Sequence, residues 1–268
     1  MSLNTASLND KHAIIYGGAG AIGSAVARAF ARAGAVVHLA GRDEAALEAV
    51  AKEIRSHGGS AHYAVVDALD KDAVEANLTA LVAGTGGIDI SLNAISVPQP
   101  GVQGIPLVDL DVDAYTDPVT TYTRSNFITA TAAARRMSER GRGVIMTLTA
   151  DPARHGAPLM GGMPAAWSSL EALTRGLSSE LAPKGVRAVG IRSQGIPETG
   201  TIATVFGLHA RALGISDQEF LAVIEQTSHL GRLPTLAEVA AAATFLASDE
   251  AAPLTGSILN LSAGSVSD

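Results

Sequence analysis

A glycine-rich turn is the stretch of this sequence best suited to bind a charged ligand. It covers residues 16–23, follows the apolar run 13–15 and precedes small and apolar residues at 24–30 with helical spacing. Glycines let the backbone turn sharply and bring its N–H groups close to a pyrophosphate at the positively polarised start of a helix. The turn therefore predicts a phosphate-binding loop, although the same glycines could serve only tight packing of strand against helix.

Segments typical of strands and helices alternate from residue 12 to about 192 and would position this loop. We expect strands at 13–15, 36–40, 64–66, 88–92, 144–148 and 186–191, and helices at 24–30, 43–57, 70–83, 119–140 and 165–181. Repeated β–α–β units imply right-handed crossovers and a parallel sheet. The predicted fold is α/β: one Rossmann-type, doubly wound parallel sheet with helices on both faces.

Two further segments are expected to shape a ligand pocket. Residues 97–118 carry four prolines and are predicted to be mostly loop. Residues 199–230 resemble two helical pieces inserted before a final helix at 236–247 and a strand at 256–261. An insert at the carboxyl edge of such a sheet lies where ligands bind, so it could be a lid or substrate region. Packing or subunit contact is the alternative.

Composition and charge narrow the class of protein. The chain has 268 residues, 47% of them hydrophobic, which suits a single domain over 1–268 with a flexible start at 1–10. A net charge of −7 without a basic cluster argues against nucleic acid. Without cysteine there is no disulfide or Cys-based metal site, and we expect no metal. The polar start and the lack of a long apolar run predict a cytoplasmic protein without membrane contact.

Residue groups spread over nearly the whole chain carry a family resemblance. Besides the glycine turn they are Asp67, Asn93-Ala94, Leu173-Thr174-Arg175, Glu180-Leu181-Ala182-Pro183, Gly195 with Thr199, Gly231-Arg232-Leu233, Phe245-Leu246-Ala247-Ser248 and Thr255-Gly256. Together they resemble the short-chain dehydrogenase/reductase family, particularly its 3-oxoacyl-carrier-protein-reductase-like members. The resemblance implies an oxidoreductase with a nicotinamide dinucleotide, a small-molecule substrate and a homo-oligomer, either tetramer or dimer.

The resemblance also implies which residues hold the cofactor. They are Gly17, Gly18, Gly20, Ala21, Ile22, Gly23, Gly41, Arg42, Asp67, Asn93, Ala94, Gly195 and Thr199. Ala21 replaces the middle glycine of the family's turn, Asp67 would contact the adenine and Thr199 the carboxamide end.

The end of the second strand bears on the choice of nucleotide. Gly41 and Arg42 stand where an NAD-preferring protein has a carboxylate for the ribose hydroxyls. A guanidinium can instead pair with a 2′-phosphate, so we expect a preference for NADP(H), with NAD still accepted. The alternative is that Arg42 lies on a solvated loop.

The family's catalytic positions are substituted in this chain. Its chemistry uses a Tyr-x-x-x-Lys pair, a Ser and an Asn; the Lys lowers the phenol's pKa from about 10 so that the phenol can exchange a proton with the substrate oxygen. The resemblance places these positions at Met163, Trp167, Ala150 and Tyr122. Because residues 160–180 contain neither tyrosine nor lysine, a shifted alignment does not restore the pair. The sequence predicts that the standard proton relay is absent.

Two hypotheses from different classes follow. In the first, the protein is an oxidoreductase whose proton comes from Tyr122 or His155, while Thr149 orients a carbonyl. Packing, a surface loop and a strand end are the respective alternatives for these three residues. Asp151 and Arg154 in the same loop could bind a polar substrate.

In the second hypothesis, the protein is a catalytically inactive nucleotide-binding or partner protein. Met160, Met163 and Trp167 would then give the pocket an apolar, adaptable lining, although they could equally be core. Non-redox chemistry has no dedicated residues in this sequence. We favour the oxidoreductase, because the cofactor contacts up to Thr199 at the nicotinamide end are retained.

Overall fold

A seven-stranded parallel sheet lies at the centre of the structure, a computed structural model that describes residues 7–267. The strand order is β3-β2-β1-β4-β5-β6-β7. The strands are β1 (His12–Tyr16), β2 (Val36–Gly41), β3 (Ser60–Val65), β4 (Ile90–Asn93), β5 (Gly143–Ala150), β6 (Val186–Ser193) and β7 (Ile258–Leu261). The predicted doubly wound sheet is confirmed, and its order reverses between β1 and β4. Such a reversal opens a crevice at the carboxyl ends of the strands.

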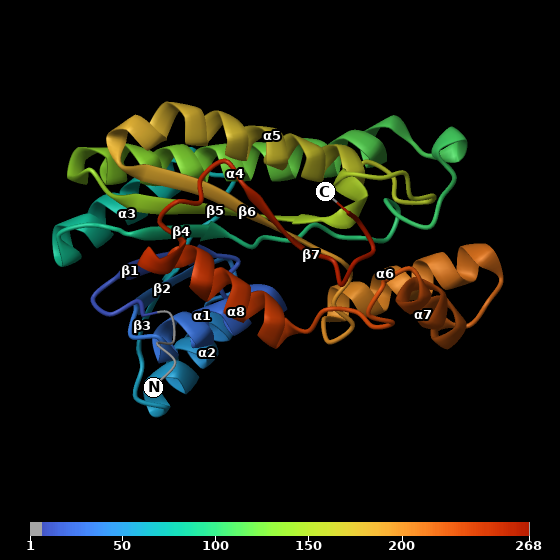
Figure 1. The fold of residues 1–268 in the computed structure, drawn as a ribbon, viewed down its shortest axis with the longest axis horizontal. Coiled ribbons are helices and arrows are strands. Elements are labelled where there is room, and N and C mark those ends of the chain that lie inside the picture. The colour runs from blue at the N-terminus through green and yellow to red at the C-terminus, as the bar shows by residue number, and fades with distance from the viewer. Residues whose placement is uncertain (1–6, 268) are drawn as a thin grey trace.

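Helices cover both faces of this sheet (Figure 1). They are α1 (Ala21–Arg32), α2 (Glu44–Ser56), α3 (Lys71–Thr85), α4 (Val112–Arg140), α5 (Met163–Leu181), α6 (Gly200–Leu213), α7 (Asp217–Gln226) and α8 (Leu236–Ala247). Figure 1 shows α3, α4 and α5 on one face, α1, α2 and α8 on the other, and α6 with α7 set to one side. The two helical pieces expected within 199–230 are α6 and α7.

Alternation along the strands divides the core into two apolar layers. On β1, Ala13 and Ile15 pack into the layer under α1, α2 and α8, while Ile14 and Tyr16 pack into the layer under α3, α4 and α5. Strands covered on both faces read as nearly continuous apolar runs, as β1 does after His12. Full burial of one such aliphatic side chain contributes about 1.5–3 kcal/mol, so the two layers fix the sheet that carries the crevice.

The start of the chain differs from the expected flexible segment 1–10. Residues 1–6 lie outside the described residues. Leu8 is fully buried, and its N–H donates to the Ala33 carbonyl at 2.8 Å. This contact fixes residues beyond 6 against the end of α1, because an apolar side chain there finds a place in the core.

The expectation that 97–118 is mostly loop is wrong for its last seven residues. Helix α4 begins at Val112, and the Asp111 carboxylate caps it by accepting hydrogen bonds from the N–H groups of Asp113 and Ala114. Pro118 lies buried inside the helix. Proline removes one helical hydrogen bond, but the Asp111 cap and the packing of the long helix outweigh that loss.

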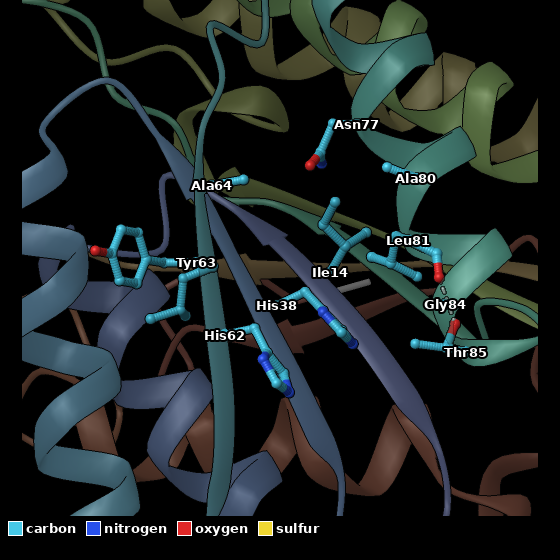
Figure 2. A pocket seen from close by; sticks show the side chains of 11 residues that line it. Ile14, His38, His62, Tyr63, Ala64, Asn77, Ala80, Leu81, Gly84 and Thr85 are labelled. Atoms are coloured by element: carbon cyan, nitrogen blue, oxygen red, sulfur yellow. Dashed lines mark hydrogen bonds between the residues drawn. The ribbon is translucent and has the colours of Figure 1, made fainter.

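Three histidines stand in a row on neighbouring strands. His12 Nδ1 and His38 Nε2 are 3.2 Å apart, and the rings of His38 and His62 stack with centroids 5.2 Å apart. His38 and His62 line a cavity of about 370 Å³ between the β2–β3 edge and α3 (Figure 2). Asn77 and Thr85 of α3 line the same cavity. Burial, together with the two neighbouring imidazoles, lowers the pKa of His38 from 6.5 to about 4.

This histidine row predicts a loss of stability in mild acid. The unfolded chain protonates His38 near pH 6.5 and the folded chain only near pH 4, so between these values the unfolded state binds more protons. As the pH is lowered from 6.5 to about 4, we expect the free energy of unfolding to fall by about 1 kcal/mol per pH unit. Urea unfolding measures this change. The decrease should be smaller in His38→Val and unchanged in His57→Gln, which alters an exposed histidine at the end of α2. An equal decrease in both variants would contradict the assignment.

Candidate functional site

The glycine turn joins β1, β4 and the start of α1 at the carboxyl edge of the sheet. Gly17 has a φ of 72°, and a Cβ placed there would lie 2.6 Å from the Ala94 carbonyl oxygen. A Cβ on Gly23 would lie 2.2 Å from the Gly17 carbonyl oxygen. The Ala94 N–H donates to the Tyr16 carbonyl at 2.9 Å. Close packing therefore requires both outer glycines of the turn, independently of any ligand.

The first turn of α1 presents backbone N–H groups that no described side chain caps. Gly20 is the N-cap of α1. The first hydrogen bond within the helix runs from the Ser24 N–H to the Gly20 carbonyl at 2.8 Å, so the N–H groups of residues 21–23 come before it. The first turn of this described helix also lacks an acidic residue. Uncapped N–H groups at a helix start bind phosphate. The predicted cradle of residues 17–23 therefore fits a pyrophosphate, with Ala21 as the first helical residue.

Two polar residues of the predicted cofactor site fix the turns after their strands. The Asp67 carboxylate accepts a hydrogen bond from the Leu69 N–H at 2.9 Å. The Asn93 side chain donates to Thr129 Oγ1 and accepts from the Ile95 N–H, both at 3.1 Å. These contacts hold the backbone at the carboxyl ends of β3 and β4, and so they shape the edge where a nucleotide would lie.

The segment after β6 carries Thr199 and an unpaired acceptor. Thr199 Oγ1 accepts from the Ile202 N–H at 3.2 Å and is the N-cap of α6. Gln194, beside Gly195, donates from Nε2 to Thr227 Oγ1 at 3.0 Å. Its Oε1 is buried and has no hydrogen-bond partner among the described residues. An acceptor of this kind fits an N–H donor of a ligand, such as a carboxamide.

The residues at the end of β2 bear on the binding of an anion. Gly41 is the last residue of β2, and Arg42 directly after it is exposed. The guanidinium therefore stands at the same carboxyl edge as the glycine turn, because parallel strands end together.

Three of the residues expected at catalytic positions of the family meet in one apolar cluster. Tyr122, Met163, Ala166 and Leu170 form it, and Trp167 packs against it. Tyr122 is 9% exposed. Burial raises the pKa of Tyr122, partly opposed by hydrogen bonds with the Val97 backbone and the Ser96 side chain. The phenol is therefore neutral at pH 7 and carries a proton.

The other two predicted catalytic residues have different surroundings. His155 is exposed, and its Nε2 lies 3.7 Å from Asp151 Oδ2. Burial raises the pKa of Asp151, opposed by a hydrogen bond from Ser265 and by the charge of His155. Thr149 Oγ1 instead contacts buried partners, at 3.4 Å from a Glu171 carboxylate oxygen and 3.4 Å from the Ile191 carbonyl. Its hydroxyl is engaged within the layer that contains α5.

The sequence interpretation missed a buried ion pair and a buried polar chain near this edge. Arg192 Nε donates to Glu171 Oε1 at 2.7 Å, and both side chains are 3% exposed. Gln99, Gln103 and His209 are also buried. The ion pair joins β6 to α5, and because its two residues lie on different elements, no local sequence spacing predicts it. The four-residue spacing of the two glutamines was the one available signal, and it lay in a segment expected to be a loop.

Within residues 7–267, no group of three or more acidic or histidine side chains could hold a metal ion. Over the same residues, no helix combines the length and the apolar character needed to cross a membrane.

Known proteins resemble this chain over nearly its whole length. A family model described as enoyl-(acyl carrier protein) reductase matches residues 17–265. An uncharacterized oxidoreductase of Mycobacterium tuberculosis is 32% identical over 98% of this chain and 95% of its own. The 3-oxoacyl-[acyl-carrier-protein] reductase of Chlamydia muridarum is 28% identical over 96% of this chain and 98% of its own. The solved structure of a gluconate 5-dehydrogenase from Burkholderia cenocepacia, in complex with NADP and tartrate, is 27% identical with a TM-score of 0.86 and 98% of each chain covered.

The packing of the glycine turn predicts opposite effects of one substitution at two positions. Gly23→Ala places a methyl group against the Gly17 carbonyl and should lower the free energy of unfolding by about 1–3 kcal/mol. Gly84→Ala, on α3 with nothing within 4 Å of the new Cβ, should raise it by about 0.5–1 kcal/mol. Urea unfolding measures both. Equal effects would show that the close approach is wrong.

Proposed function

The chain belongs to the short-chain dehydrogenase/reductase family, and we propose that it is an oxidoreductase that binds NADP(H) and acts on a carbonyl or alcohol substrate. The observation that carries the cofactor assignment is the uncapped start of α1 at the glycine turn. The buried, unpaired Oε1 of Gln194 supports a carboxamide nearby. A relative of known structure was solved with NADP and tartrate, which supports a small polar substrate here.

Different residues would hold different parts of the cofactor. Within the glycine turn of residues 17–23, the uncapped backbone N–H groups of residues 21–23 would hold the pyrophosphate. The turn at Asp67 would hold the adenine, and Gln194 and Thr199 the carboxamide end. Arg42 would pair with a 2′-phosphate. When bound, a nicotinamide supplies or accepts the hydride. The remaining tasks of the chain are to orient the substrate and to provide a proton.

We propose that Tyr122 provides that proton in place of the family's relay. Met163, Trp167 and Ala150 occupy the relay positions and carry no exchangeable proton suited to this role. Tyr122 is the neutral phenol in the same cluster. As a carbonyl carbon is reduced, the substrate oxygen takes the phenolic proton, and solvent returns it. His155 is the second candidate, reaching solvent beside Asp151.

The alternative function is nucleotide binding without turnover. The observation that favours it is the apolar filling of the cluster: Met163, Ala166 and Leu170 are each about 1% exposed or less. A protein that had lost its catalytic activity would keep the residues that bind the cofactor and fill the positions of the former relay with apolar side chains.

We also propose a homo-oligomer, either dimer or tetramer, and a cytoplasmic location. Val112 and Phe127 on α4 are 69% and 55% exposed, and Phe245 on α8 is 38% exposed. Apolar side chains of this size on exposed helix faces support association. Light scattering on the eluted protein distinguishes a monomer from the proposed dimer or tetramer.

Cofactor selectivity tests the role of Arg42. Calorimetric titration should show NADPH binding more tightly than NADH. In Arg42→Ala the affinity for NADPH should fall about tenfold, as expected for loss of one charge-assisted pair, while the affinity for NADH changes little. Arg32→Ala, which alters an arginine at the far end of α1, is the control. Equal losses for both nucleotides would contradict the assignment.

Turnover tests the proton donor. With a carbonyl substrate identified by NADPH consumption, Tyr122→Phe should reduce kcat by 10²-fold or more, since general acid catalysis contributes about 10²–10⁴-fold. Tyr115→Phe, on the same helix, should retain kcat. If Tyr122→Phe and His155→Ala both keep full turnover, neither residue is the donor. NADPH binding without consumption across a broad carbonyl panel would support the binding-only alternative.

A further inference from the structure

A chain of buried polar side chains links α6 to the loop at 97–110. His209 Nε2 and Gln103 Oε1 are 3.0 Å apart, and Gln103 Nε2 donates to Gln99 Oε1 at 2.6 Å. Gln99 Nε2 donates to the Val97 carbonyl at 2.7 Å. His209, Gln103 and Gln99 are 5%, 3% and 4% exposed, so water does not compete for these bonds. Because Gln103 uses its amide N–H toward Gln99, its oxygen accepts from His209.

The far end of this chain reaches Tyr122. The Val97 backbone, whose carbonyl is held by Gln99, lies beside the Tyr122 phenol and opposes the rise of its pKa, as does the Ser96 side chain. Val97 and Val102 of the same loop pack against the apolar cluster of Tyr122. Three side chains and the packing of Val97 therefore connect a helix of the insert to the phenol proposed as proton donor.

Close backbone packing keeps the loop in place between two segments. The Gly104 N–H donates to the Leu159 carbonyl at 2.8 Å, and a Cβ on Gly104 would lie 3.0 Å from the Leu208 carbonyl oxygen. Gly161 has a φ of 54°, and a Cβ there would lie 2.2 Å from the Val102 carbonyl oxygen. The loop is thus confined between α6 and the segment that precedes α5.

The second helix of the insert belongs to the same unit. The ring of Phe220 on α7 lies 5.3 Å, centroid to centroid, from that of His209 and 5.3 Å from that of Phe206 on α6. Movement of α6 away from the loop would therefore carry α7 with it.

We propose that His209, Gln103 and Gln99 form a latch that closes the α6–α7 insert on the loop and positions Tyr122. These three are positioning residues, because they act through Val97. The positioning role rests on the proposed function, whereas the closure of the insert does not. Opening must break the contact between His209 and Gln103, since it is the hydrogen bond that joins the insert to the loop, while the Gln103–Gln99 and Gln99–Val97 bonds lie within the loop itself.

Hydrogen–deuterium exchange on the full-length protein tests the latch without any ligand. Gln103→Leu keeps the side-chain volume and removes both hydrogen bonds. It should speed exchange at least fivefold in both residues 97–110 and residues 200–226, while the strands β1 to β6 keep their protection. Gln218→Leu, the same change at an exposed site on α7, should leave both segments as they are. Faster exchange in one segment only, or unchanged exchange in both, would overturn the latch.

Kinetics test the positioning of Tyr122 separately. In Gln103→Leu we expect kcat to fall at least fivefold while the Kd for NADPH stays within twofold. The separate variant His209→Gln keeps a donor for the Gln103 oxygen, so its loss of kcat should be smaller. A parallel loss of NADPH binding, or an unchanged kcat, would overturn the positioning role. If the wild-type protein binds NADPH but turns over no carbonyl, the proposed reaction fails while the exchange result still decides the latch.

Discussion

The close approach of Gly17 to Ala94 is the contact on which the carboxyl edge of this protein depends. No side chain fits at Gly17, because a Cβ would lie 2.6 Å from a carbonyl oxygen, and Gly23 is equally confined. The approach brings β1 against β4 where the strand order reverses and begins α1 directly behind the turn. The crevice and the open N–H groups of α1 are therefore two results of one packing constraint, and a pyrophosphate would use geometry that the fold already needs.

The carboxyl edge of the sheet is polar at one end and apolar at the other. At the nucleotide end, polar side chains such as Asp67 and Asn93 hold backbone turns, and the groups left open are main-chain donors, one arginine and the oxygen of Gln194. At the proposed reacting end, the cluster around Tyr122 and Met163 is apolar and buried. Burial keeps the phenol protonated, which suits a proton donor and makes a phenolate unfavourable. The same burial explains why binding without turnover is the natural competitor of the redox function.

Much of the fold followed from the sequence because its signals are local. Apolar runs ending at glycine or a polar cap predicted the strands, and the helix expected at 236–247 is α8 (Leu236–Ala247). The start of α4 was missed because Pro118 outweighed the cap at Asp111, and Leu8 because a short polar terminus hides one core residue. The candidate site residues named from the sequence lie in short local motifs, and their roles stay predictions. Contacts between distant segments, such as Glu171 with Arg192 and Gln103 with His209, have no local spacing and emerge only when the elements pack.

The central claim is that this chain transfers hydride with Met163, Trp167 and Ala150 at the positions that we propose for the family's relay. Deuterium transfer tests it most directly: the protein is incubated with NADPH deuterated at the transferable position of the nicotinamide C4 and a panel of small polar ketones and aldehydes, and the alcohols formed are examined by mass spectrometry. We predict at least one alcohol that carries a single deuterium on the former carbonyl carbon, in an amount that depends on the protein. Tight NADPH binding with no deuterated product from the whole panel would contradict the claim and identify a nucleotide-binding protein built on a reductase fold.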